Sequence, residues 1–265
     1  MSTAHDMDAE APVLIERDGA VGLVLLNRPK KRNALDIAMR AAIAAAVTGL
    51  SADESVRVLV VSGGSELFAA GADLKLLAEQ DPQGVAALDL PGYWAPLARC
   101  PKPVIAAVNG FAVGIGVTLL LHSDLVYVGQ NAKLQMPFTN IGICPEFSST
   151  YLLPRIMGNV RAAELTLFGE PFTAAKALEY GLVNEVLPDA EVEPRALERA
   201  RKLAQQAPNA LRVTKKLLHH WSEKTALEAI QVEADHFIPM LGQPEALEAM
   251  TAFMQKRKPD FSKFK

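Results

Sequence analysis

The sequence is poor in cysteine, in aromatic residues and in net charge, and the shortages of cysteine and of net charge each argue against a class of protein. Cys100 and Cys144 are the only cysteines among 265 residues, which is too few for a disulfide framework. We therefore expect a reducing compartment. Aromatic residues make up 6% of the chain, and the formal net charge is -3. A charge of that sign and size argues against a nucleic-acid partner.

Targeting and membrane segments are also missing from the sequence. The opening stretch MSTAHDMDAE has neither the basic run nor the apolar run of a secretory signal. The chain contains no continuous apolar stretch long enough for a membrane span, and its end, FSKFK, is not a peroxisomal address. We expect a cytoplasmic protein with no membrane partner.

The chain does contain enough apolar sequence for a substantial core, because 50% of its residues are hydrophobic. Short apolar runs typical of strands alternate with helical segments as far as about residue 148, which predicts the α/β class. A helix is expected over Asn33–Leu50, with Asn33 or Asp36 as its N-cap. The expected strands are Val13–Arg17, Val21–Leu26, Arg57–Ser62, Pro103–Val108 and Leu125–Val128.

Beyond residue 148 the strand signals nearly vanish, and the pattern predicts an α-rich C-terminal third. One short strand is expected there, at Val183–Leu187. The expected helices are Arg161–Phe168, Ala174–Tyr180, Glu193–Gln206 and Ala210–His220.

The most informative motif is NGFAVGIGVTLL at 109–120, which follows the apolar run PVIAAVN. It predicts a strand, a glycine-spaced turn and then an apolar helix. Gly114 and Gly116 have no Cβ to cover nearby backbone N–H groups, and a helix N-terminus adds partial positive charge there. Such a turn can hold a developing anion without a charged side chain.

A second turn of small residues occurs in FAAGADL at 68–74. Gly71 permits a backbone conformation that other residues resist, and Asp73 is well placed to cap a following helix. By itself this pattern indicates no more than a capping turn. Together with the downstream motif it supplies two N–H donors from separate elements, which is the arrangement of an oxyanion hole.

FAAGADL, PKPVIAAVNGFAVGIG and ALEYGLVNEVLP, in this order and spacing, resemble the crotonase family of enoyl-CoA hydratases and isomerases. The resemblance runs from Arg28-Pro29 to TAFMQKRKPDF near the end of the chain. It implies a spiral core of ββα turns over residues 1–200, which binds acyl-CoA and performs catalysis. It also implies a helical trimerisation region over 201–265, and hence a homotrimer or a dimer of trimers.

The resemblance also assigns roles to individual residues. The backbone N–H groups of Ala72 and Ile115 would hold the thioester oxygen of an acyl-CoA. The CoA-binding residues that it implies are Arg28, Lys30, Ala70, Ala72, Asp73 and Lys256. Among these, Lys256 would reach CoA bound to a neighbouring subunit. Because CoA is part of the substrate, no separate cofactor is expected, and no metal is expected.

Two departures from the hydratase pattern decide which branch of the family is expected. Hydratases carry one glutamate in a pattern like GGGCEL and another in a pattern like QPE. The matching stretches are GIGVTL and MPF, so these places hold Thr118 and Phe138. Neither side chain can serve as an acid or a base, which argues against hydration by the usual mechanism.

The segment PFTNIGICPEFSSTYLLPRIM is instead similar to the peroxisomal-type Δ3,Δ2-enoyl-CoA isomerases. Glu146 matches the single acid of that branch. Phe147 stands where the branch usually has glycine, which would narrow the acyl pocket. The expected acyl-pocket residues are Thr118, Phe138, Asn140 and Phe147.

Isomerisation of a 3-enoyl thioester requires only one carboxylate. A 3-enoyl thioester has acidic protons at C2, and removal of one gives a dienolate with charge on the thioester oxygen. Glu146 as base and then acid would return a proton at C4, so no water needs to be activated. Its apolar sequence neighbours should raise its pKa. We therefore predict an enoyl-CoA isomerase, an enzyme that transposes a carbon–carbon double bond.

The sequence is also compatible with other functions. The chain could be a hydratase, a diene isomerase or an acyl-CoA hydrolase or dehalogenase in which Glu146 attacks carbon. With only Trp94 and Trp221 it lacks the tryptophan-rich pocket of the aryl-CoA dehalogenases. A non-catalytic acyl-CoA-binding oligomer is the alternative from a different class.

Overall fold

The computed structural model describes residues 11–73, 89–220 and 222–264. Its main element is a six-stranded sheet in the order β1-β2-β3-β4-β6-β9, in which β1 and β2 are antiparallel and the other neighbours are parallel. These strands are β1 Val13–Asp18, β2 Val21–Leu26, β3 Val58–Ser62, β4 Val104–Val108, β6 Leu125–Gly129 and β9 Glu185–Leu187. A smaller sheet joins β5 Phe111–Val113, β7 Lys133–Gln135 and β8 Phe172–Thr173.

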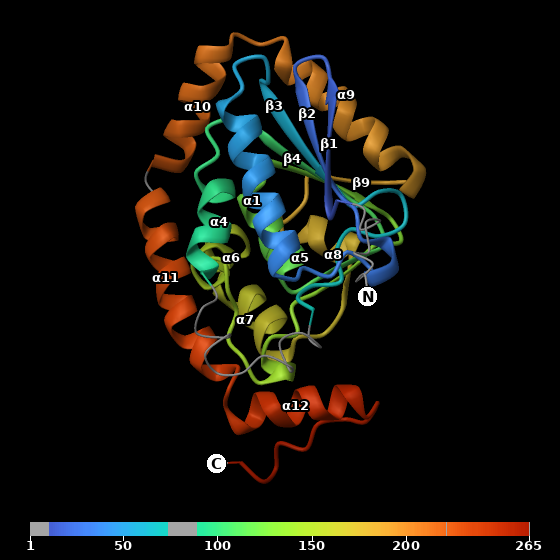
Figure 1. Cartoon of the computed structure of the whole chain (residues 1–265), viewed down its shortest axis with the longest axis vertical. Helices are drawn as coiled ribbons and strands as arrows, with labels where there is room; N and C mark the ends of the chain where they lie inside the picture. The colour runs from blue at the N-terminus through green and yellow to red at the C-terminus, as the bar shows by residue number, and fades with distance from the viewer. Residues whose placement is uncertain (1–10, 74–88, 221, 265) are drawn as a thin grey trace, which may run out of the picture.

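Helices surround the large sheet, as Figure 1 shows. The α-helices are α1 Ile37–Ala52, α4 Leu90–Ala98, α5 Ile115–Thr118, α6 Ser149–Met157, α7 Asn159–Phe168, α8 Ala174–Glu179, α9 Val192–Ala204, α10 Pro208–His220, α11 Glu223–Met240 and α12 Pro244–Met254. Short 3-10 turns are η1 Pro29–Lys31, η2 Leu119–His122, η3 Thr139–Ile141 and η4 Asp189–Glu191. The α/β class predicted from the sequence is confirmed.

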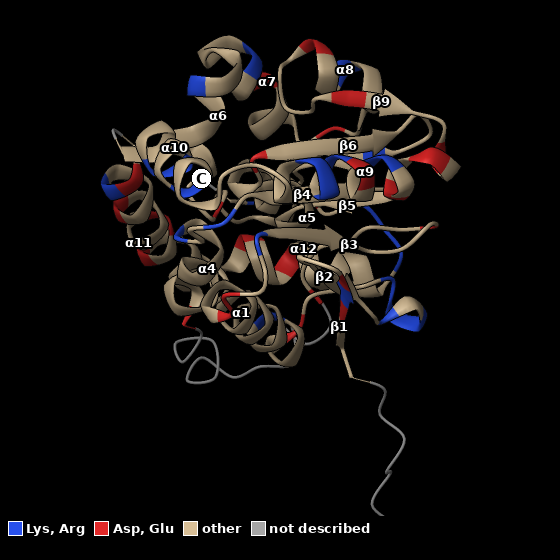
Figure 2. Ribbon diagram, turned by 90° about the horizontal axis from the view of Figure 1, so that it is seen from above, with Lys and Arg blue, Asp and Glu red and all other residues tan. Residues whose placement is uncertain are grey.

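The central strands β3 and β4 are buried on both faces of the large sheet, and their side chains alternate between the two faces, whereas most of β1 is exposed. In β3, Leu59 and Val61 pack into the core that contains α1 and α4, whereas Val58 and Val60 pack against α9. The central strands β3 and β4 are free of blue and red in Figure 2, whereas the edge strands β1 and β9 carry charged residues. This explains why the strands read as continuous apolar runs.

The C-terminal helices fold back over the same chain. In Figure 1, α10, α11 and α12 run along one side of the molecule and then beneath it. Helix α11 packs on α4 and α6, and α12 packs on η3. Phe237 of α11 is 3% exposed and belongs to the core. The last helices therefore help to close the cavity described next.

Candidate active site

Asn33 fixes the first of the two small-residue turns. Its side-chain amide donates hydrogen bonds to the carbonyl oxygens of Phe68 (3.0 Å) and Gly63 (3.3 Å), while its oxygen accepts one from Arg28 N (2.8 Å). The helix cap falls instead to Asp36, whose carboxylate accepts from Met39 N at 2.8 Å. Of the two candidate N-cap residues, Asp36 caps the helix, and Asn33 instead holds the turn through its side-chain hydrogen bonds.

The two turns lie directly against each other. Ala69 N donates to Phe111 O, and Val113 N donates to Ala69 O, both at 2.9 Å. The contact needs glycine: a Cβ added at Gly71, where φ is +91°, would lie 2.9 Å from Val113 O. A Cβ added at Gly116 would lie 2.9 Å from Ala69 O. Two turns that are more than 40 residues apart in sequence are thus brought together by backbone contact.

The backbone N–H groups of Ala72 and Ile115 both belong to residues that line one cavity. Helix α5 begins at Ile115, after Gly114 with φ 53° and ψ -116°, so the Ile115 N–H is one of the free donors of a helix start. Within the described residues, neither N–H donates to a protein acceptor. The arrangement leaves two donors available to an oxygen in the cavity.

Glu146 supplies the only carboxylate that lines this cavity among the described residues. It is 4% exposed, and two side chains donate to it: Trp94 Nε1 to Oε2 (3.2 Å) and Thr118 Oγ1 to Oε1 (3.3 Å). Burial raises its pKa, and the charge of Arg40 and these two hydrogen bonds partly oppose that rise. A carboxyl group of this kind is suited to taking up a proton and returning it.

Arg40, from α1, lines the same cavity and is 4% exposed. Its Nε donates to Leu35 O at 3.2 Å, and its guanidinium lies 5.5 Å from the centre of the Trp94 ring. Burial lowers the pKa of Arg40, and the Glu146 charge is the largest influence opposing it. The site therefore contains one buried cation and one buried anion.

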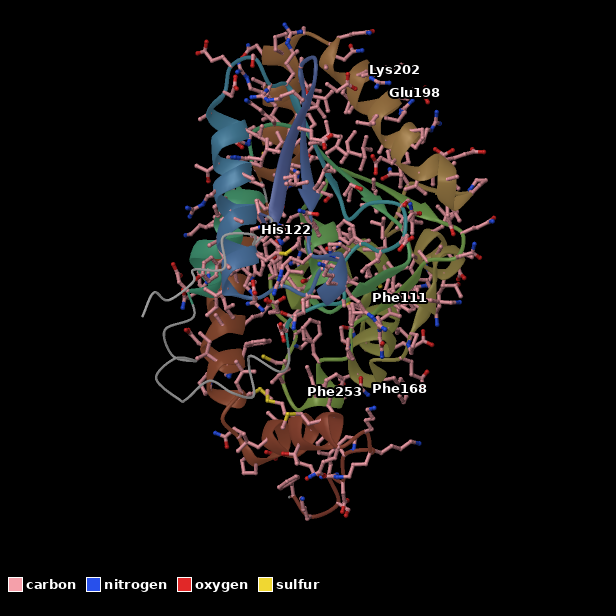
Figure 3. The ribbon with its side chains drawn as sticks, turned by 45° about the vertical axis from the view of Figure 1, so that its right-hand side comes forward. Phe111, His122, Phe168, Glu198, Lys202 and Phe253 are labelled. Carbon is pink, nitrogen blue, oxygen red and sulfur yellow. The ribbon has the colours of Figure 1, made fainter. Side chains whose placement is uncertain are left out.

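Phe147 does not narrow the cavity as the sequence analysis expected. Phe147 is 1% exposed, its ring stacks between those of Trp94 (5.0 Å between centroids) and His122 (3.9 Å), and it is not among the residues that line the cavity. Its φ is 59° and that of Ser148 is 53°, a conformation that glycine adopts more readily. Figure 3 shows His122 in the interior of the molecule. The stacked rings hold the strained backbone directly after Glu146.

A second buried carboxyl group, Glu233 of α11, lies behind the site. Its Oε1 accepts from Thr150 N (2.8 Å) and Thr150 Oγ1 (2.5 Å), which ties α11 to the start of α6. Burial raises the pKa of Glu233 to about 7, and Glu146 contributes to the rise. Because Glu233 does not line the cavity, it supplies no second acid there.

The other predicted residues fall in different places. Phe138 and Ala70 line the cavity. Thr118 does not line it, and instead donates a hydrogen bond to Glu146, which does. Asn140 does not line it: its exposed side chain donates to Phe168 O at 3.0 Å, across a turn on the surface. Asp73 lies at the edge of the described residues, and the helix that it was expected to cap falls outside them.

The basic residues expected to bind CoA are partly committed to protein contacts. Arg28 is half-buried and pairs with Asp36, with 2.6 Å between Nη1 and Oδ2. Lys30 is exposed in η1, and Lys256 is exposed just after α12 with φ 53°. That Lys256 reaches CoA bound to a neighbouring subunit stays a prediction.

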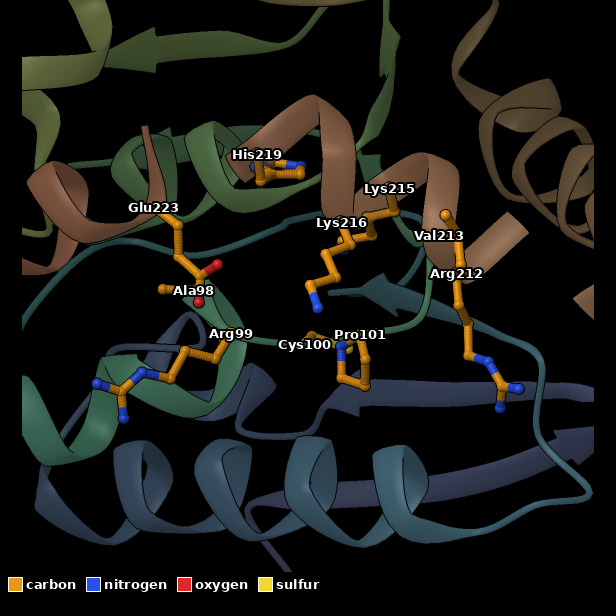
Figure 4. A pocket seen from close by; sticks show the side chains of 10 residues that line it. All are labelled: Ala98, Arg99, Cys100, Pro101, Arg212, Val213, Lys215, Lys216, His219 and Glu223. Atoms are coloured by element: carbon orange, nitrogen blue, oxygen red, sulfur yellow. The ribbon is translucent and has the colours of Figure 1, made fainter. Parts of the chain in front are cut away.

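A roomier pocket of about 280 Å³ opens elsewhere, between α10 and the chain that follows α4 (Figure 4). In Figure 4 the side chain of Lys216 extends toward Pro101, whereas those of Arg99 and Arg212 point away to opposite sides. None of the predicted site residues lines this pocket. Pocket volume alone therefore does not locate the site. The smaller cavity is the candidate site because the N–H groups of Ala72 and Ile115 and the carboxylate of Glu146 belong to residues of its wall.

Residues 11–73, 89–220 and 222–264 contain no group of three or more His, Cys, Asp or Glu side chains placed to hold a metal ion. Over the same ranges, none of the helices combines the length and the apolar character needed to cross a membrane.

Comparison with known proteins agrees with this geometry. The model of the enoyl-CoA hydratase/isomerase family matches residues 16–264. The 2,3-dehydroadipyl-CoA hydratase of Escherichia coli is 38% identical over 94% of this chain and 98% of its own length. Human enoyl-CoA delta isomerase 2 is 36% identical over 84% of this chain and 58% of its own length. The chain belongs to the enoyl-CoA hydratase/isomerase family, also called the crotonase superfamily.

Solved structures give the same answer for the fold. The structure of Pseudomonas aeruginosa OdaA is 41% identical, covers 92% of this chain and 99% of its own, and superposes with a TM-score of 0.88. The chain therefore has the crotonase fold, a mixed α/β core with a helical C-terminal region. Its activity is that of an acyl-CoA hydratase or isomerase of this family.

Sequence reasoning missed three side chains around the site: Arg40, Trp94 and Phe237. One signal could have found Arg40. Helical spacing places it on the buried stripe of α1 with Met39, Ile43 and Val47, where a charge is unusual. No comparable signal marks Trp94 or Phe237, because apolar residues in helices are ordinary core.

Proposed function

We propose that this enzyme is a Δ3,Δ2-enoyl-CoA isomerase that uses one carboxyl group, Glu146, to move a proton from C2 to C4. The observation that carries the proposal is that Glu146 is the single carboxylate on the cavity wall among the described residues. The two places where hydratases carry acids hold Thr118 and Phe138, which are 0% and 4% exposed.

The steps follow from the residues in the cavity. The thioester oxygen lies between the N–H groups of Ala72 and Ile115, and Glu146 removes a proton from C2. The electrons of the broken C2–H bond form a dienolate, with double bonds C1=C2 and C3=C4, and negative charge gathers on the thioester oxygen, where the two donors stabilise it. The protonated Glu146 then delivers its proton to C4 while the carbonyl re-forms and the C1=C2 electrons move to C2–C3, which gives the 2-enoyl thioester.

The hydrogen bonds to Glu146 support this role. Trp94 and Thr118 hold one carboxylate oxygen each, so the group is oriented while it changes protonation state. Burial raises its pKa and makes it a stronger base than an exposed glutamate. Relatives are named for both chemistries, as the E. coli hydratase and the human delta isomerase are, so the assay must separate hydration from isomerisation.

The test compares Glu146→Gln with wild type on trans-3-hexenoyl-CoA and trans-2-hexenoyl-CoA. We expect wild type to convert the 3-enoyl substrate without hydrating the 2-enoyl one, and the substitution to lower kcat by about 10²–10⁴-fold. Glu198→Gln is the matched control, because Glu198 is exposed on α9, where Figure 3 places it at the surface. Robust hydration of the 2-enoyl substrate would refute the isomerase proposal and favour a hydratase. Binding of CoA with no turnover would favour a non-catalytic acyl-CoA-binding protein.

A further inference from the structure

The guanidinium of Arg40 is buried beside the cavity with few protein partners. Its side chain reaches the cavity wall from α1, where only 4% of the residue is exposed. Among the described residues, Nε has one acceptor, Leu35 O, and no acceptor receives a hydrogen bond from either terminal nitrogen. A guanidinium carries five N–H donors, so most of this one's hydrogen-bonding capacity is unused.

The nearby carboxylates do not use that capacity. Asp36 is paired with Arg28. Glu146 accepts from Trp94 and Thr118, and no ion pair within 4.0 Å joins it to Arg40. The face of the Trp94 ring is the remaining neighbour, with 5.5 Å between the guanidinium carbon and the ring centroid. A buried charge without a hydrogen-bonded counterion is costly, so such groups are usually paired.

The cavity offers the place for a counterion. It encloses about 70 Å³, and its wall brings Arg40 together with the donors at Ala72 and Ile115 and with Glu146. Apolar side chains, including Ile141 and Phe237, make up much of the remaining wall. A purely apolar acyl group would pack against these apolar side chains, but it would leave the guanidinium of Arg40 desolvated and without a counterion.

We propose that Arg40 receives a carboxylate at the far end of the acyl group, so that the preferred substrates are CoA thioesters of short dicarboxylic acids. Guanidinium is the side chain best matched to a carboxylate, because two of its N–H groups can bind both oxygens at once. This inference rests on the proposed function only in that the acyl group occupies the cavity. The negative charge that it adds is neutralised by Arg40, so Glu146 is spared repulsion from its own substrate.

The test measures affinity, which requires no turnover. Dissociation constants are determined by calorimetry for saturated CoA thioesters in matched pairs, adipyl against hexanoyl and glutaryl against valeryl, which differ in a carboxylate and a methyl group. We expect wild type to bind the diacid of at least one pair about 10–100-fold more tightly. Equal or tighter binding of the monoacid at both lengths overturns the inference, whether or not any variant folds.

Variants then assign the preference to Arg40. In Arg40→Met the ratio of diacid to monoacid affinity should fall to about one. Arg40→Lys should keep part of the diacid preference, because lysine retains the positive charge but cannot bind both carboxylate oxygens through two parallel N–H groups. Arg201→Met is the matched control: Arg201 is exposed on α9 and pairs with Asp18. A ratio that Arg40→Met leaves unchanged would overturn the inference.

The outcome is separable from that of the proposed function. If wild type isomerises hexenoyl-CoA but shows no diacid preference, the isomerase proposal stands and the role of Arg40 fails. If diacid preference is found but neither hexenoyl-CoA nor hexenedioyl-CoA is isomerised, the substrate class stands and the chemistry must be reassigned.

Discussion

Trp94→Phe removes one hydrogen bond to Glu146 and should move the pH dependence of catalysis. The indole Nε1 donates to Glu146 Oε2 at 3.2 Å, and both groups are buried. This bond favours the charged carboxylate, so its loss raises the pKa of Glu146 further. Phenylalanine keeps a ring for stacking on Phe147 but has no N–H.

The size of the shift follows from the bond. Hydrogen bonds to charged groups contribute roughly 1.5–3 kcal/mol, and 1.36 kcal/mol corresponds to about one pKa unit. Because 3.2 Å is at the long end of the normal range, we use the lower end and expect a rise of about one unit.

The assay is the pH profile of kcat/KM for 3-hexenoyl-CoA. A general base must be ionised, so activity falls as pH drops through its pKa, and the acid limb of Trp94→Phe should lie about one unit above that of wild type. Thr118→Val, which removes the 3.3 Å bond to Oε1, should shift the limb in the same direction by less. An acid limb that stays in place while the plateau falls would mean that Trp94 acts only through packing, and would refute this account.

Two further predictions concern the second carboxyl group and the contact between the turns. Glu233 has a folded-state pKa of about 7 against an ordinary value of 4.5, so wild-type stability should fall as pH rises between these values, by roughly 3 kcal/mol. In Glu233→Gln the free energy of unfolding, followed by urea titration from pH 4 to 8, should lose most of this slope, and parallel curves would contradict the burial argument. Gly116→Ala places a Cβ 2.9 Å from Ala69 O and should lower kcat about tenfold or more by spreading the two N–H donors, with stability reduced by about 1–3 kcal/mol. Gly49→Ala is its control, because a Cβ there meets nothing within 4 Å, and an unchanged kcat in Gly116→Ala would show that the donors do not depend on this contact.

Much of the fold could be read from the sequence, because the central strands are apolar on both faces and the helices are amphipathic. The strand Val21–Leu26 has the predicted bounds, and Val104–Val108 begins one residue later than predicted. The expected helix over Asn33–Leu50 begins later, at Ile37, since Asp36 is the residue that caps it. Asn33 could not be assigned correctly, because the carbonyl oxygens that accept from its side-chain amide lie 30 or more residues away.

The site could be predicted only in part. Glycine turns leave a local signature, so the two turns could be recognised; the family resemblance assigned Ala72 and Ile115 within them, and both residues line the cavity. Asn140 was misplaced, because a polar residue beside a turn looks the same whether it faces a cavity or the surface. Phe147 was misplaced for a different reason: its ring direction is set by stacking on Trp94 and His122, which come from distant elements.

The sequence by itself determined the α/β class, the two small-residue turns and the presence of one acid where related hydratases carry two. These features depend on local spacing and on residue type. Tertiary structure alone decided that Arg40 and Trp94 converge on Glu146 and that α11 closes the cavity with Phe237. The physical reason is that burial, charge pairing and hydrogen bonding depend on distance in space, and the chain fixes these distances only once it has folded.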